Sequence, residues 1–90
     1  MAKVLVVAKV YPSDINIDLD ELADKIRKKL PEEADIARSA KEPIAFGLTA
    51  LKLYILIPEE TEGGTEKVEE ALRSVEGVEE VEIELVQRVS

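Results

Sequence analysis

The spacing of apolar residues along this chain changes from a period of two to a period of 3.6 and back. Residues 3–10, KVLVVAKV, are rich in valine and almost continuously apolar, which predicts a strand that is covered on at least one face. The residues after Asp18 then repeat their apolar side chains at helical spacing until Pro31. Because Asp18 is a suitable N-cap, the spacing predicts a helix that begins near Leu19 and ends before Pro31.

The middle of the chain returns to a period of two. Residues 34–40, ADIARSA, are small and alternate weakly, which indicates an edge strand. Residues 50–57, ALKLYILI, alternate strongly, so that four large aliphatic side chains share one face, and Pro58 closes the segment. A second pair of strands is therefore predicted, with a loop around Phe46 between them.

The last third of the chain again predicts a helix followed by a strand. Val68, Ala71, Leu72 and Val75 form one stripe of a second predicted helix, and Gly77 is its expected C-cap. Residues 78–89 then alternate Val81, Ile83 and Leu85 with glutamates, which predicts a final strand.

The predicted order of elements is βαββαβ. In a chain of 90 residues this order favours one α+β domain, residues 1–90, with a ferredoxin-like fold. Such a sandwich has a four-stranded antiparallel sheet with two helices on one face. The fold supports many unrelated activities, so the function must be inferred from individual sites.

Charge is distributed unevenly along the chain, whose formal net charge is -8. Residues 1–58 contain nine acidic and nine basic residues, whereas residues 59–84 contain eleven acidic and two basic ones. Direct binding to nucleic acid is disfavoured, because that affinity comes from clustered cations. The acidic segment 59–84 is interpreted either as a solvated face or as a docking surface for a basic partner.

The residue types that are missing narrow the chemistry. The chain contains no cysteine and no histidine, which removes disulfides, thiol nucleophiles, common zinc ligands and the commonest general base. We therefore expect no enzymatic activity, no bound metal and no cofactor. The longest apolar run, LYILI, is far below the roughly 20 residues of a membrane span. A cytoplasmic protein that does not enter membranes is expected.

Phe46 is the only phenylalanine of the chain, and it lies in the loop EPIAFGL rather than in a predicted helix or strand. Pro43 stiffens the approach to this loop, and Gly47 permits a positive φ directly after the ring. Two interpretations remain open from the pattern. The loop holds the ring outward for a partner, or the ring folds back over the end of the sheet.

Four segments resemble the elongation factor 1-beta family: VLVVAKVYPSD, PIAFGLTALKLYI, EGGTEKVEEAL and the ending VQRV. Together they cover essentially the whole chain, which is similar to the archaeal, single-domain form. The resemblance implies guanine-nucleotide exchange on the GTPase elongation factor 1-alpha, which delivers aminoacyl-tRNA to the ribosome. An exchange factor of this kind makes and breaks no covalent bond.

The resemblance also implies which residues contact the GTPase. Phe46, flanked by Ile44 and Gly47, matches the loop aromatic that docks into the nucleotide-binding domain. Arg88 matches a near-terminal lysine that in eukaryotic members intrudes beside Mg²⁺ and the phosphates. Arginine is a broader, planar cation than lysine, so the alternative for Arg88 is a strand-end cation that offsets Glu82 and Glu84.

A second class of function is a small-molecule regulatory module that oligomerises through its sheet. Leu5, Val7, Tyr54 and Leu56 would form an apolar open face in such a protein. An unusually apolar sheet favours this alternative. An exposed Phe46 loop close to the carboxyl terminus favours nucleotide exchange by a protein that is monomeric when free.

Overall fold

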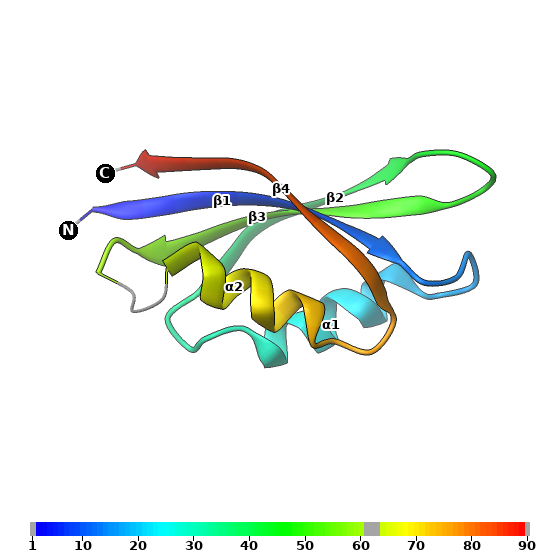
Figure 1. The fold of residues 1–90 in the computed structure, drawn as a ribbon, viewed down its shortest axis with the longest axis horizontal. Coiled ribbons are helices and arrows are strands. Elements are labelled where there is room, and N and C mark those ends of the chain that lie inside the picture. The colour runs from blue at the N-terminus through cyan, green and yellow to red at the C-terminus, as the bar shows by residue number, and fades with distance from the viewer. Residues whose placement is uncertain (1, 61–63, 90) are drawn as a thin grey trace.

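The computed structural model describes residues 2–60 and 64–89 and contains one antiparallel sheet with two helices packed on the same face (Figure 1). The strand order is β2-β3-β1-β4. The α+β, ferredoxin-like βαββαβ arrangement is confirmed. The elements are β1 (Lys3–Pro12), α1 (Leu19–Lys29), β2 (Asp35–Pro43), β3 (Thr49–Pro58), α2 (Gly64–Arg73) and β4 (Val78–Val89).

The molecule is elongated along the direction of the strands, with extents of 41 × 19 × 17 Å. Figure 1 shows both ends of the chain at one end of the sheet and the turn between β2 and β3 at the other. These two ends are the surfaces that the sequence singled out, because one carries Arg88 and the other carries Phe46.

The core lies between the sheet and the two helices. The alternation in β3 is confirmed, since Leu51, Leu53, Ile55 and Ile57 are all buried. Leu22 and Ile26 of α1 and Val68 and Leu72 of α2 cover them from the helical side. Burial of these side chains provides the main favourable free energy of folding.

Helix α1 begins at Leu19, as predicted. The Asp18 side chain accepts hydrogen bonds from the backbone N–H groups of Asp20 and Glu21, at 2.9 and 3.3 Å. These bonds satisfy two of the donors that a helix N-terminus leaves without intrahelical partners. Leu22, one turn further on, is buried, so the cap also fixes how the helix meets the core.

The predicted role of Gly77 is wrong. Helix α2 ends at Arg73, and Gly77, with a φ of 102°, lies in a separate turn in which the Val78 N–H donates to the Val75 carbonyl. Val75 is buried although it lies beyond the helix. An apolar residue just past a helix end continues the stripe in the sequence, and the stripe alone therefore overestimated the length of the helix. The first glycine of EGGTEK lies outside the described residues.

The regular alternation expected for residues 78–89 is interrupted. Ala8 of β1 faces Ile83, but Val7 faces Leu85, which leaves Glu84 as an extra residue in a β-bulge. Leu85 therefore lies on the face of the sheet away from the helices and is 44 % exposed. Residues after the bulge have exchanged faces relative to the simple alternation.

Candidate functional site

A tight turn connects β2 to β3 and carries Phe46 at its tip. Strand β2 extends to Pro43, further than the predicted residue 40, so only residues 44–48 separate the two strands. The Leu48 N–H donates to the Ala45 carbonyl at 3.0 Å, and the Ile44 N–H donates to the Leu48 carbonyl at 2.9 Å. The strands thus hold the turn from both sides.

Phe46 and Gly47 both have a positive φ, of 55° and 77°. A positive φ at both central residues is the signature of a type I′ turn, for which Asn-Gly, Asp-Gly and Gly-Gly are preferred. Phenylalanine at the first position costs roughly 1–2 kcal/mol relative to a residue that tolerates this region. The predicted freedom of Gly47 is confirmed, and the strain at Phe46 was not foreseen.

The Phe46 side chain is 99 % exposed, so the ring does not fold back over the end of the sheet. Ile44 in the same loop is 38 % exposed. A large ring that is both strained and solvent-exposed contributes nothing to the core of this chain. Strained residues concentrate at binding sites, which makes this turn the best candidate for one.

Arg88 lies near the end of β4, opposite Val4 of β1. Its Nε atom is 3.1 Å from Oε2 of Glu59, the residue after β3, and both side chains are exposed. The alternative role of Arg88, a strand-end cation that offsets Glu82 and Glu84, receives no support, because these two carboxylates contact Tyr11 and Lys52. The bulge at Glu84 also places Arg88 on the opposite face of the sheet from them.

The Phe46 loop is exposed but does not lie near the carboxyl terminus, so only the first half of the arrangement that would favour nucleotide exchange is observed. Arg88 faces Val4, and Val4 faces Ile57 close to the end of β3, whereas Phe46 precedes the start of β3. The two residues therefore lie at opposite ends of the sheet (Figure 1). They cannot reach one small site on a partner together.

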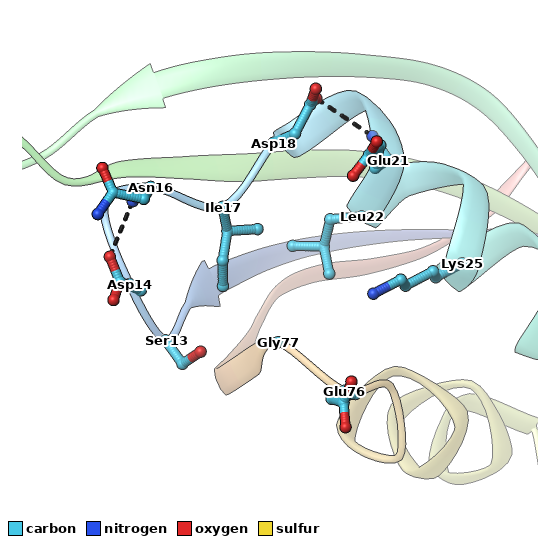
Figure 2. Close-up of a pocket in the computed structure, with 10 residues that line it drawn as sticks. All are labelled: Ser13, Asp14, Asn16, Ile17, Asp18, Glu21, Leu22, Lys25, Glu76 and Gly77. Atoms are coloured by element: carbon cyan, nitrogen blue, oxygen red, sulfur yellow. Dashed lines mark hydrogen bonds between the residues drawn. The ribbon is translucent and has the colours of Figure 1, made fainter.

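A hollow of about 450 Å³ lies between the start of α1 and the turn before β4 (Figure 2). Its rim carries the carboxylates of Asp14, Asp18, Glu21 and Glu76 and one cation, Lys25. Asp14 and Asp18 already accept backbone hydrogen bonds, which Figure 2 marks for Asn16 and Glu21. Within residues 2–60 and 64–89, no group of three or more acidic side chains is arranged to hold a metal ion.

The face of the sheet away from the helices is partly polar. Lys9 forms an ion pair with Glu42, and Lys52 forms one with Glu84 at 3.3 Å. The hydrogen bond between Lys9 and Glu42 raises the pKa of Lys9 and lowers the pKa of Glu42. The hydrogen bond to Glu84 likewise raises the pKa of Lys52.

The remaining part of this face is apolar. Val7 is only 4 % exposed, Leu5, Tyr54 and Leu56 are half-buried, and Leu85, opposite Val7, is 44 % exposed. The apolar residues on which the alternative of an oligomerising regulatory module depends therefore do lie together on this face, beside the two ion pairs. No helix in the described part of the chain is long and apolar enough to span a membrane.

Sequence reasoning missed Ile15, which lies in the loop between β1 and α1 and is 62 % exposed. The only local signal was an isoleucine between Asp14 and Asn16, in a segment that otherwise has the composition of a turn. Burial cannot be read from such a segment, because its residues follow neither period.

Comparisons with known proteins identify the family of this chain. The family profile of the EF-1 guanine nucleotide exchange domain matches residues 5–89. A protein named Elongation factor 1-beta from Hyperthermus butylicus is 64 % identical over 90 residues, which are 100 % of this chain and 98 % of the relative. Proteins of the same name from Staphylothermus marinus and Ignicoccus hospitalis are 62 % and 58 % identical, each over 100 % of this chain and over 100 % and 96 % of the relative. The chain therefore belongs to the elongation factor 1-beta family.

Proposed function

We propose that residues 1–90 act as one exchange domain that promotes the replacement of GDP by GTP on the GTPase elongation factor 1-alpha. The observation that carries this proposal is the match of the exchange-domain profile to residues 5–89, which include every strand and helix except the start of β1. The protein accelerates exchange by stabilising the nucleotide-free GTPase. It needs no catalytic group, metal or cofactor of its own for this.

Phe46 is the proposed anchor at one end of the molecule. Aromatic side chains are frequent binding hot spots, because they bury a large area for the loss of few rotatable bonds. The turn already holds the Phe46 ring away from the core, with Ile44 and Gly47 beside it. Little conformational freedom of the backbone is then lost when the partner binds.

Arg88 is the proposed active cation at the other end. A P-loop GTPase holds its diphosphate through Mg²⁺, backbone donors and a lysine. A guanidinium inserted beside the phosphates competes with Mg²⁺ and loosens the nucleotide. Because Arg88 contacts Glu59 in the free protein, this ion pair has to open before the side chain enters the GTPase.

The separation of Phe46 from Arg88 requires a contact with two distant regions of the GTPase. Phe46 is therefore proposed to anchor the factor on the nucleotide-binding domain at a distance from the site that Arg88 enters. The acidic segment 59–84 is proposed to face basic residues of the GTPase between these two contacts. The free protein is proposed to be a monomer, since the open sheet face carries two ion pairs.

The proposal is tested by the release of labelled GDP from the purified cognate GTPase in the presence of excess unlabelled GTP. Wild-type protein at a tenth of the GTPase concentration is expected to release all of the label, because one exchange factor acts on many GTPase molecules. Phe46→Ala is expected to slow release, whereas Lys28→Ala, an exposed change on α1 away from both ends, is expected to have no effect. GDP release that the wild-type protein does not accelerate contradicts the proposed function.

A further inference from the structure

Three of the exposed apolar side chains of this protein gather at one end of the sheet. Five large ones are exposed among the described residues, and three of them, Ile15, Ile44 and Phe46, belong to the loops at the end opposite the termini. Ile15 comes from the loop that follows β1, and the other two come from the turn between β2 and β3. Figure 1 shows these two loops, which are about 30 residues apart in sequence, at the same end of the sheet.

A hollow of about 210 Å³ joins the two loops, because Ile15 and Gly47 both line it. Pro12, Ile17, Leu19 and Thr49 form most of the remaining wall. This volume is below the roughly 300–1,000 Å³ of a typical small-molecule pocket. One apolar side chain that protrudes from a partner protein suits the hollow better than a free ligand does.

The charges around this hollow favour a basic partner. Asp14 and Lys41 line it, and Lys41 is engaged by Asp20, with its Nζ atom 3.4 Å from Oδ1. The carboxylates of Asp14 and Asp20 therefore outnumber the single ammonium group at this hollow. A partner surface with basic residues around an apolar side chain complements this arrangement.

We infer that Ile15 and Phe46 form one docking surface, in which the hollow between their loops receives an apolar side chain of the GTPase and the surrounding carboxylates face its basic residues. This inference rests on the proposed function and extends it, because it adds Ile15 as a contact residue. The two neighbours of Ile15 are joined by a hydrogen bond of 2.9 Å, which the Asn16 N–H donates to the Asp14 Oδ1 atom. The backbone at Ile15 is therefore already held in place.

The test measures the affinity of the whole protein for the nucleotide-free GTPase, together with GDP release. Ile15→Ser is expected to bind about tenfold more weakly, which corresponds to about 1.4 kcal/mol. Ile15→Leu, which keeps the apolar volume, is expected to bind like wild type. The thermal midpoint of Ile15→Ser should equal that of wild type, because the side chain is largely exposed.

The double variant Ile15→Ser, Phe46→Ala tests whether the two side chains form one surface. Residues that contact the same partner side chain are coupled, so the combined loss of affinity is expected to be smaller than the product of the two single losses. Losses that multiply fully would overturn the single surface. Asp14→Asn removes the charge but keeps the oxygen that accepts the hydrogen bond from the Asn16 N–H. The variant is expected to slow association with the GTPase at low salt but not at high salt. Unchanged association at low salt contradicts the inference that the carboxylates face basic residues of the partner.

The remaining outcomes separate this inference from the proposed function. If wild-type protein accelerates GDP release and Ile15→Ser matches it in affinity and rate, only the role of Ile15 is wrong. If wild-type protein does not accelerate release, both are wrong. If the protein forms dimers in sedimentation experiments and Ile15→Ser abolishes them, a second copy of the chain occupies the surface and the inference is overturned.

Discussion

Replacement of Phe46 by glycine is expected to stabilise the protein while it weakens nucleotide exchange. Most substitutions of a phenylalanine destabilise a fold, and the loss for a buried one is about 3–5 kcal/mol. Phe46 differs because its ring is 99 % exposed and its φ is 55°. Stability and activity should therefore change in opposite directions.

The expected gain follows from two opposing terms at Phe46. Relief of the left-handed conformation contributes roughly 1–2 kcal/mol, and no buried area is lost with the ring. Glycine loses roughly 0.5–1 kcal/mol through the greater freedom of its unfolded state. The net stabilisation is about 0–1.5 kcal/mol, and its central value of about 0.75 kcal/mol raises the thermal midpoint of a domain of this size by about 3–6 °C.

The assay combines thermal unfolding with GDP release for wild type, Phe46→Gly and Phe46→Ala. Alanine removes the ring but keeps most of the strain, so its midpoint should remain near that of wild type while its exchange rate falls as in Phe46→Gly. This comparison separates the ring from the backbone. A loss of several kcal/mol in the free energy of unfolding of either variant would refute the reasoning. A GDP release rate that stays at the wild-type level with both variants would refute it as well.

Four further predictions concern charged groups. Arg88→Ala should bind the GTPase but release GDP more slowly than wild type and with less sensitivity to added Mg²⁺, whereas Arg88→Lys should retain most activity. Equal GDP release rates for Arg88→Ala and wild type in a Mg²⁺ titration would leave Arg88 as a strand-end charge. Glu59→Gln should free Arg88 and accelerate exchange about twofold or more, with a change in stability below about 1 kcal/mol because the ion pair is exposed; a slower rate would show that Glu59 orients Arg88 instead. Association should slow as salt rises if the acidic segment 59–84 faces a basic surface, and stopped-flow rates that do not depend on salt would assign it to solvent. Lys9 lowers the pKa of Glu42 below its ordinary 4.5, so their pairing stabilises the fold above that pH and is lost as the pH falls through the lowered pKa. Denaturant unfolding across pH 2–7 should therefore show that Glu42→Gln loses less stability in acid than wild type does.

Local signals in the sequence were sufficient for the order of the elements and for the presence of a specialised loop around Phe46. Asp18 caps a helix through bonds to residues two and three positions away, so its role is visible in a short window. Pro43 and Gly47, which lie on either side of Phe46, are an equally local signal and predicted a specialised loop. Its outward ring and its strain became known only from the backbone angles and exposure of the turn.

Features that depend on the register between strands could not be predicted. The separation of Phe46 from Arg88 follows from the antiparallel directions of β1, β3 and β4, which the predicted fold already implied. The face that Arg88 occupies depends on the register and the bulge of β4, which the sequence pattern does not contain. Ile15 was missed for a related reason, because its exposure depends on how its loop meets the turn between β2 and β3. Both features involve contacts between segments that are distant in sequence.

The bulge at Glu84 decides which face of the sheet carries the Arg88 side chain. In β4, even-numbered residues before the bulge point away from the helices, as Glu82 does opposite Lys9, whereas after it they share the helical side, as Arg88 does opposite Val4. Deletion of Glu84 would remove the bulge and leave Arg88 opposite Val4, on the same side of the sheet. A regular strand that kept Glu84 in the ladder would instead turn Arg88 to the opposite side. The position of this charge therefore depends on Glu84 being left out of the pairing as well as on the identity of residue 88.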